Sequence, residues 1–365
     1  MMQISPEIQL FIREHSSDDV RVLALQAKKY PDIDMPTVIT QIAGRKVAAE
    51  KIPSWWEIEK IWYPKHLSLE QCSSEITARY KARLLQGDSL TDLTGGFGID
   101  CSFLATGFKS ATYVERQEEL CEIAAHNFPV LNLNHINIKN EDGVTYLQAM
   151  SPVDCLFLDP ARRNEHGGKT VAISDCEPNV AELEELLLQK ANRVMIKLSP
   201  MLDLSLALKE LKQTQEVHIL SVNNECKELL ILLGQTSPAE ISIHCVNLFT
   251  KGTQKEQHFV FTREQEQCSE CTYTDSLETY LYEPNASLLK AGAFRSIAAA
   301  YPVRKLHPNS HLYTSDTFIE NFPGRIFRIV NQCSFNKKEV KENLADLKKA
   351  NVTVRNFPAL SPYPK

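Results

Sequence analysis

A glycine-rich turn in the first third of the chain begins with an acidic residue. It reads Asp92-Leu93-Thr94-Gly95-Gly96-Phe97-Gly98 and follows a short apolar run. Glycines let the backbone approach a ligand closely, and a helix after such a turn offers unpaired N–H groups. A carboxylate inside the turn faces a pyrophosphate unfavourably, whereas it attracts an ammonium group. The turn therefore suits a ligand with a cationic amino-acid end.

Two further acidic side chains follow expected strands. Glu115 ends a strand at 110–115, and Asp142 comes shortly after one at 136–139. Because ligands of open parallel sheets bind beyond the carboxyl ends of the strands, these acids are expected at one edge. Glu115 suits the two hydroxyls of a ribose, and Asp142 suits the amino group of an adenine. Each of them could equally have a purely structural role, as a helix cap or as a solvated charge in a loop.

Asp159-Pro160-Ala161-Arg162-Arg163 closes the fourth expected strand and supplies the candidate catalytic residues Asp159, Pro160 and Arg162. Burying a carboxylate is costly unless it is paired or used. Asp159 is therefore expected either to accept a hydrogen bond from a substrate or to be held by Arg162 or Arg163. The polar loop 164–169 that follows is long enough to close over a substrate.

Strand-like and helical stretches alternate between residues 86 and 237. The expected strands are 89–93, 110–115, 136–139, 153–158, 193–198 and 218–222, and a seventh at 226–233 follows too closely for a crossover helix. This alternation predicts an α/β, Rossmann-like, doubly wound sheet whose last two strands pair antiparallel. Residues 1–85 show helical spacing of apolar residues, 238–279 hold two strand-like runs, and 280–365 begin another α+β unit.

The composition favours a cytoplasmic protein. No apolar run reaches the roughly 20 residues that cross a bilayer, and no export signal opens the sequence. The ten cysteines are mostly single and lie in apolar or helical stretches, as in reduced proteins. Cys268 and Cys271 have a metal-like spacing, but no second pair accompanies them, so no metal site is expected.

The charge is unevenly distributed along the chain. From residue 280 onward there are 13 Lys and Arg against 6 Asp and Glu, a net charge of +7, while the preceding part carries −13. Grouped basic residues fit a nucleic-acid partner, because they neutralise phosphates. A solvated lysine-rich helix at 337–349 explains nearly half of the excess equally well.

The sequence resembles the class I methyltransferases that use S-adenosylmethionine (SAM), and more narrowly a bacterial group with a ferredoxin-like module and a THUMP-like domain after the catalytic domain. The matching segments are 73–81, 92–100, 158–163 and 282–286. The resemblance implies SAM as cofactor, with its methionine end at 92–98, its ribose at Glu115, its adenine near Asp142 and the reacting group near Asp159-Pro160.

The resemblance also implies a division of the chain and an RNA substrate. It makes 86–237 the methyltransferase domain after an N-terminal helical domain at 1–85. It further makes 238–279 the ferredoxin-like module and 280–365 the THUMP-like domain, which is expected to lack part of the family pattern beyond Lys365. THUMP domains bind RNA in tRNA-modifying enzymes, so methylation of tRNA or rRNA is expected by analogy.

The atom that would be methylated is not evident from the motifs. Enzymes that methylate exocyclic amines often carry prolines and an aromatic after the acid, whereas this chain continues with Ala161-Arg162. Carbon-5 methylation needs a cysteine nucleophile, and Lys197-Leu198-Ser199-Pro200 has none. A base could stack on Trp55, Trp56, Trp62 and Tyr63, although such aromatic residues more often form core.

Two other classes of function stay open. One is a non-catalytic protein that binds SAM or RNA. The other is an NAD-dependent oxidoreductase, which is disfavoured because Cys101 stands where the dinucleotide fingerprint needs its third glycine. The motifs leave the oligomeric state undetermined.

Overall fold

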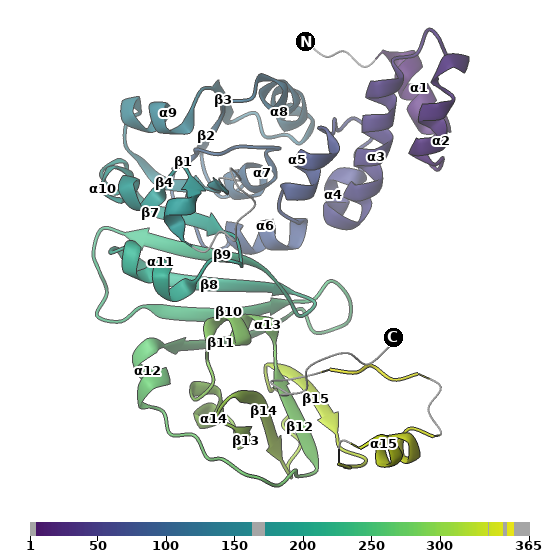
Figure 1. Cartoon of the computed structure of the whole chain (residues 1–365). Helices are drawn as coiled ribbons and strands as arrows, with labels where there is room; N and C mark the ends of the chain where they lie inside the picture. Colours follow the sequence, from purple (N-terminus) through teal and green to yellow (C-terminus); the bar gives the residue numbers. More distant parts are fainter. Residues whose placement is uncertain (1–4, 163–171, 335, 346–348, 354–365) are drawn as a thin grey trace. The chain divides into compact units, whose positions relative to one another are not determined.

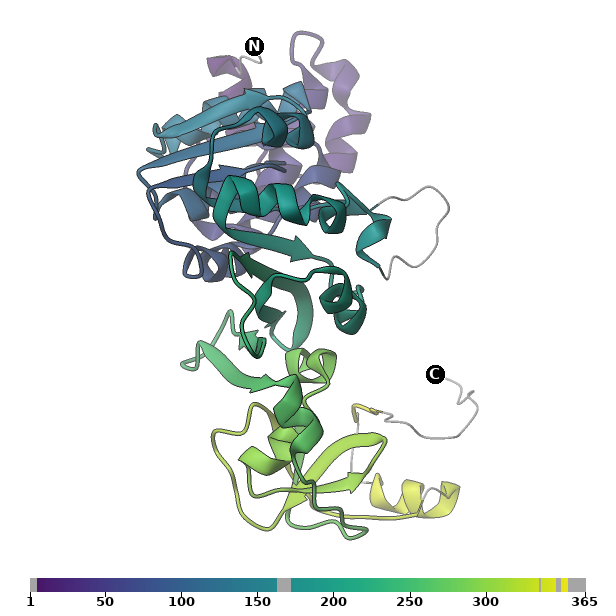
Figure 2. The ribbon, with the colours of Figure 1, turned by 90° about the vertical axis from the view of Figure 1, so that its left-hand side faces the viewer.

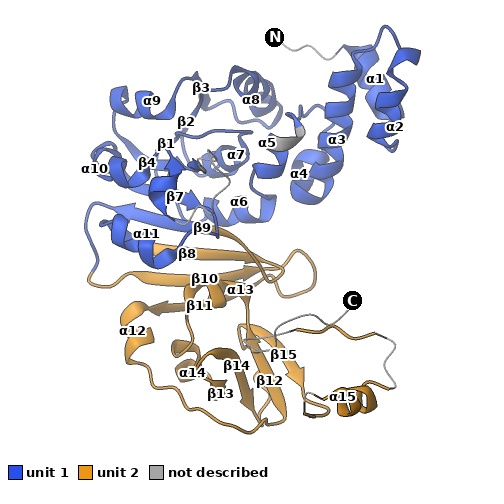
Figure 3. Cartoon of the chain, viewed as in Figure 1, with its two compact units in different colours: residues 1–215, 229–238 blue, residues 216–228, 239–365 orange. Residues whose placement is uncertain are grey.

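The computed structural model describes residues 5–162, 172–334, 336–345 and 349–353. The chain divides into two compact units, residues 1–215 with 229–238 and residues 216–228 with 239–365 (Figure 3). None of the helices within the described ranges is sufficiently long and apolar to span a membrane.

The N-terminal part is helical, as the spacing of its apolar residues predicts. Ser5, Asp19 and Asp34 cap the first three α-helices by accepting hydrogen bonds from first-turn N–H groups. Two buried apolar clusters hold this part together, and one of them includes Phe97 of the glycine-rich turn. The helices are α1 (Pro6–Glu14), α2 (Val20–Leu25), the 3-10 helix η1 (Ala27–Lys29), α3 (Met35–Lys51), α4 (Pro53–Trp56), α5 (His66–Gln71) and α6 (Glu75–Ala82).

A large sheet follows, and it has the predicted Rossmann-like alternation of strand and helix. Among the described residues its strand order is β11-β10-β8-β9-β7-β4-β1-β2-β3. The strands are β1 (Ser89–Asp92), β2 (Ser110–Glu115), β3 (Ile136–Asn140), β4 (Val153–Leu158), β7 (Ala191–Leu198), β8 (Thr214–Val222), β9 (Glu225–Gly234), β10 (Ser242–Leu248) and β11 (Glu256–Thr262).

The sheet is doubly wound. Helices α7 (Ile99–Ala105) and α8 (Glu118–Val130) lie on one face, while α9 (Gly143–Ala149) and α10 (Val180–Lys190) lie on the other (Figures 1 and 2). Strand order reverses where β1 pairs with both β2 and β4, all in parallel. The carboxyl ends of β1 and β4 thus form the switch point at which such sheets bind ligands. Helix α11 (Leu204–Glu210) precedes β8.

The predicted seventh strand is β9. It neighbours β8 through a turn at Asn223-Asn224, both with positive φ, and runs antiparallel to β7 on its other side. Asparagine tolerates this left-handed conformation better than most residues, which suits a two-residue hairpin turn.

The two strands predicted in the range 238–279 are present. They extend the large sheet, because β10 pairs parallel with β8 and β11 pairs antiparallel with β10. An isolated two-stranded hairpin is marginal in water, whereas pairing with β8 buries Ile243, Cys245 and Val246. The boundaries proposed at residues 85 and 237 stay predictions.

The C-terminal region is α+β, as predicted. Its antiparallel sheet has the order β13-β14-β12-β15. The elements are α12 (Arg263–Cys268), β12 (Tyr280–Pro284), α13 (Ala286–Ala291), α14 (Ser296–Ala300), β13 (Arg304–His307), β14 (Ser310–Ser315), β15 (Gly324–Arg328) and α15 (Lys337–Asn343). The remaining short elements, β5 (Ala161–Arg162), η2 (Ile173–Asp175) and β6 (Cys176–Glu177), follow β4.

Candidate active site

The glycine-rich turn lies between β1 and α7, and each of its glycines is required for a different structural reason. A Cβ on Gly95 would stand 2.3 Å from the ring of Tyr113, so any side chain is excluded there. Gly96 and Gly98 have φ angles of +54° and +86°, which L-residues rarely adopt. The Gly96 backbone has open space beside it, with Thr94 O the nearest atom at 3.8 Å from a built Cβ. The turn thus exposes backbone where a ligand can approach.

Asp92 ends β1 and is 1% exposed. Its Oδ1 accepts a hydrogen bond from the Thr94 N–H at 3.0 Å, while its buried Oδ2 has no hydrogen-bond partner among the described residues. Burial raises the pKa of Asp92 well above its ordinary value, and the nearby carboxyl groups of Asp100, Asp159 and Glu115 raise it further. A buried acceptor without a donor is uncommon in proteins, so this oxygen indicates a missing cationic or donor group.

Glu115 ends β2 and is held by the turn itself. Its Oε2 accepts a hydrogen bond from the Gly96 N–H at 2.9 Å, and its Oε1 accepts one from the Gln117 N–H at 2.8 Å. Each carboxylate oxygen can accept further bonds, so the group is oriented without being saturated. This geometry fits the recognition of two adjacent hydroxyl groups.

Asp142 is exposed and caps α9. Its Oδ1 accepts hydrogen bonds from the N–H groups of Val144 and Thr145, each at 3.0 Å. The structure therefore shows Asp142 as a helix cap, and its contact with an adenine stays a prediction. Behind the cap, Gly143 packs so closely on Leu93 that a Cβ would meet the Leu93 carbonyl oxygen at 2.2 Å.

Asp159 follows β4, and its side chain pairs with a lysine from the neighbouring strand. Lys197 Nζ in β7 lies 2.5 Å from Asp159 Oδ2. Burial raises the pKa of Asp159 even though Lys197 opposes that shift. The Asp159 N–H donates to Thr94 Oγ1 at 2.6 Å, so the loop after β4 is tied to the glycine-rich turn. Pro160, the next residue, is buried.

Lys197 belongs to a buried polar network that the motifs did not reveal. Ser73 Oγ donates to Asp100 Oδ2 at 2.7 Å, and Lys81 Nζ lies 3.0 Å from Asp100 Oδ1. Lys197 Nζ lies 3.1 Å from Ser73 Oγ and 3.4 Å from Asp100 Oδ2. Burial raises the pKa of Asp100, but Lys81 and Lys197 outweigh it and hold the pKa at about 2.

A sequence signal for this network did exist. Ser73 and Lys81 stand in the segment 73–81 that carries the family resemblance, and Lys197 follows the apolar run Val194-Met195-Ile196 within a strand. A lysine in a buried strand needs a partner. What the sequence lacks is any indication that this partner is Asp159, 38 positions away along the chain.

The remaining candidate residues are only partly placed. Arg162 lies in β5, whose backbone pairs with Cys176 in β6. Arg163 and the loop 164–169 lie outside the described residues. A possible pairing of Asp159 with Arg162 or Arg163 therefore stays a prediction beside the ion pair with Lys197.

The aromatic segment is mainly core. Trp55 is 2% exposed and packs edge-on against Phe97, with ring centroids 5.2 Å apart, and Tyr63 is buried beside the same ring. Trp62 stacks on His126 at 3.7 Å. Phe97 thus anchors the turn to the N-terminal helices. Trp56, at 42% exposure, is the more accessible indole.

Comparison with known protein families identifies two domains in the C-terminal part of the chain. Family models match residues 280–323 as a ferredoxin-like domain and residues 324–362 as a THUMP domain-like region. Both domains were expected, but the ferredoxin-like match lies C-terminal to the range 238–279. A search of curated protein sequences found no match.

Among solved structures, a candidate methyltransferase from Porphyromonas gingivalis W83 is 35% identical, with a TM-score of 0.84 over 97% of this chain and 88% of that one. The modification subunit of a candidate type I restriction enzyme from Vibrio vulnificus YJ016 is 12% identical, with a TM-score of 0.38 over 55% and 56% of the two chains. An rRNA methylase from Streptococcus thermophilus is 14% identical, with a TM-score of 0.32 over 44% and 93%.

The last two likenesses are too distant to carry an argument. The first covers nearly the whole chain at substantial identity, and the two family models account for its C-terminal part. The chain therefore belongs to the same family as the Porphyromonas protein, the class I methyltransferases whose sequence ends in a ferredoxin-like and a THUMP-like domain.

Proposed function

We propose that this protein transfers the methyl group of SAM to a nucleotide in RNA. The observation that carries the proposal is the buried Asp92 carboxyl at the switch point of the sheet, whose Oδ2 has no hydrogen-bond partner within the described part of the chain. Asp100 and Asp159 pair with Lys81 and Lys197, so it is chiefly the carboxyl groups of Asp92 and Glu115 that disfavour an anionic ligand. They suit a ligand with an ammonium and a sulfonium group, and they disfavour the pyrophosphate of NAD.

The donor set fits SAM at each of its polar ends. Asp92 would accept a hydrogen bond from the ammonium, and Gly95 and Gly96 would line the approach of the methionine part. Glu115, held by two backbone N–H groups, would accept both ribose hydroxyls. Asp142 would receive the adenine amino group while it caps α9. SAM, when bound, supplies an electrophilic methyl carbon.

The residues after β4 and β7 would then position the acceptor. Asp159, oriented by Lys197 and by its N–H bond to Thr94, would accept a hydrogen bond from the target nitrogen. Correct alignment alone can contribute about 7–11 kcal/mol to methyl transfer. Arg162 would hold an RNA phosphate beside it. The THUMP domain-like match at 324–362 supports RNA as the substrate class.

Isothermal titration of the full-length protein with SAM and with S-adenosylhomocysteine tests the cofactor. Asp92→Asn should lose binding because the ammonium loses its charged partner. Asp88→Asn, at the opposite end of β1 and exposed, is the matched control and should bind normally. Failure of the wild type to bind either compound would refute the proposal, and NADH is titrated in parallel.

Labelled SAM incubated with cellular RNA tests the reaction. The wild type should label an RNA fraction, and Asp159→Asn should lower labelling strongly while it leaves S-adenosylhomocysteine binding intact. Donor binding without transfer to any RNA pool would instead favour the non-catalytic SAM-binding alternative.

A further inference from the structure

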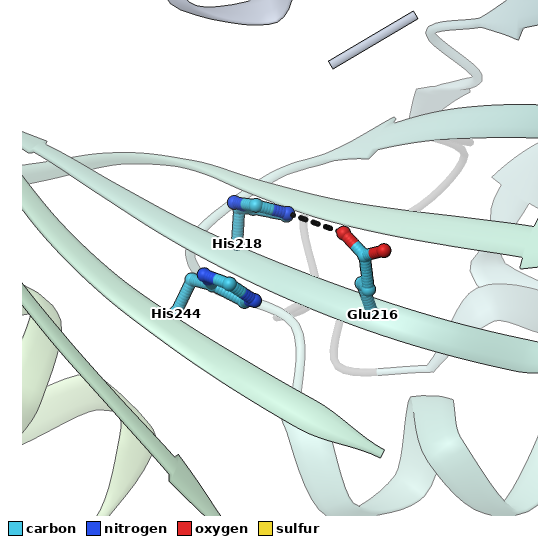
Figure 4. A group of neighbouring side chains, drawn as sticks. All are labelled: Glu216, His218 and His244. Carbon is cyan, nitrogen blue, oxygen red and sulfur yellow. Dashed lines mark hydrogen bonds and ion pairs between the residues drawn. The ribbon is translucent and has the colours of Figure 1, made fainter. Parts of the chain in front are cut away.

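A second cluster of chemically competent side chains lies on β8 and β10, within the unit of residues 216–228 and 239–365. Glu216, His218 and His244 each offer a ligand atom, and these atoms all lie within 4.8 Å of one another. Figure 4 shows the two imidazoles on neighbouring strands and the dashed contact between His218 and Glu216. The proposed methyl transfer uses none of these residues.

Strand register explains why the three side chains meet. Glu216 and His218 are two positions apart on β8 and therefore share a face of the sheet. His218 stands directly opposite His244 in the parallel pairing of β8 with β10, and their rings stack at 4.3 Å. His218 Nε2 lies 3.2 Å from Glu216 Oε2. The pairing of β8 with β10 therefore places all three side chains on rigid strands, and no loop contributes to the cluster.

The environment of His244 leaves one ring nitrogen suited to coordination. Its Nδ1 lies 3.1 Å from His258 Nε2, and its Nε2 lies 3.2 Å from Ser242 Oγ. If Nδ1–H donates to His258, Nε2 carries the lone pair, and this lone pair can bind a metal once the Ser242 hydroxyl rotates away from it. This is the arrangement in which outer partners orient a metal-ligating histidine.

We propose that Glu216, His218 and His244 bind one divalent transition-metal ion of the zinc class between β8 and β10. Two imidazoles and one carboxylate are ligands that Zn²⁺ accepts in tetrahedral sites, at about 2.0–2.2 Å. The ligand atoms lie within 4.8 Å of one another, and the two stacked imidazole rings have to turn out of their parallel arrangement to converge on one ion. Three protein ligands leave a fourth position for water, and His258 serves as the outer partner of His244.

Titration of the metal-free, full-length protein with Zn²⁺ against a chromophoric chelator tests the proposal. The wild type should bind one ion per chain, and Co²⁺ in its place should show the visible absorption of a tetrahedral site. Glu216→Gln preserves shape and hydrogen bonding but removes the anionic ligand, so it should abolish this binding. His244→Gln should do the same, and His258→Gln should weaken binding by about 10–100-fold.

His307→Gln is the control, because His307 is an exposed histidine of the same unit outside the cluster. It should bind like the wild type. Absence of a tetrahedral Co²⁺ spectrum in the wild type would overturn the site. Zn²⁺ binding that is equal in the wild type and in Glu216→Gln would overturn it as well. The Glu216→Gln variant tests the metal site even if the His244→Gln variant fails to fold. Circular dichroism of each variant monitors its folding.

Discussion

At the scale of single residues, Asp92 combines a structural cost with a proposed binding role. Its carboxyl is buried, lacks a donor for Oδ2 in the described part of the chain, and lies near three other acids. Burying an ionisable group in this way destabilises the charged form. Proteins tolerate such a cost chiefly at functional sites, where the ligand supplies the missing partner.

Asp92→Asn should therefore stabilise the ligand-free protein, by about 1–3 kcal/mol near neutral pH. The raised pKa of Asp92 means that the folded state holds a proton more tightly than the unfolded state does. Wild-type stability consequently falls as pH rises from the unfolded pKa through the folded one. Urea unfolding of both proteins at about pH 5 and about pH 7.5 measures this. The advantage of the variant should grow with pH, and a more stable wild type at neutral pH would contradict the argument.

At the scale of elements, the network around Asp100 joins α6, α7 and β7. Lys81 on α6 and Lys197 on β7 both pair with this one carboxylate on α7. Removing one partner of a buried ion pair leaves an uncompensated charge and typically costs about 3–5 kcal/mol. The network thus couples the helix before the sheet to the strands that carry the site.

Acid titration tests that coupling. The pKa of Asp100 is held at about 2, below its unfolded value, so its contribution is fully present above the unfolded pKa. That contribution, about 2–3 kcal/mol, should disappear as pH falls from about 4 through about 2. Lys81→Met should lower stability at neutral pH and shift the acid-induced loss to higher pH, as followed by chemical unfolding across this range. Identical pH profiles for the variant and the wild type would exclude this role.

The glycine-rich turn allows a matched pair of substitutions. Gly95→Ala should cost about 1–3 kcal/mol, because the new methyl group meets the buried Tyr113 ring. Gly96→Ala has open space, so it should cost only about 1 kcal/mol, the strain of its positive φ. Thermal unfolding compares the two directly. A larger loss from Gly96→Ala would show that close packing on Tyr113 does not determine the turn.

At the scale of the whole molecule, the chain joins an acidic catalytic part to a basic C-terminal part. The net charge of +7 from residue 280 onward coincides with the ferredoxin-like and THUMP domain-like matches. In the described part of this region, Lys337, Lys338 and Lys341 are exposed on α15. Electrostatic contact with RNA phosphates is the role that such side chains would serve.

Alanine at Lys337, Lys338 and Lys341 together should weaken RNA binding and reduce its salt dependence. Each lost phosphate contact lowers the slope of log affinity against log salt by about 0.7 for a single strand. Fluorescence anisotropy with labelled RNA at several salt concentrations measures both effects, and S-adenosylhomocysteine binding should not change. An unaltered slope would indicate that α15 is merely a solvated helix.

Much of the fold could be read from the sequence because it rests on local patterns. The helical spacing of apolar residues predicted the helical N-terminus. Short apolar runs in alternation with helical stretches predicted the doubly wound sheet and the strand ends that place Asp92, Glu115 and Asp159 at one edge. The glycine-rich turn could also be predicted, since the positive φ angles that it needs are a preference of glycine as a single residue.

The sequence did not predict which residues far apart in the chain pair with one another. Lys197 meets Ser73 across 124 positions, and His218 meets His244 only because β10 pairs with β8 in one particular register. The same pairing explains why the strands at 242–248 and 256–262 extend the large sheet. The sequence by itself determined the kinds of elements and the acids at their ends, because neighbouring residues set both. Only the tertiary structure decided which charges pair, since burial against a partner strand is the result of packing the whole sheet.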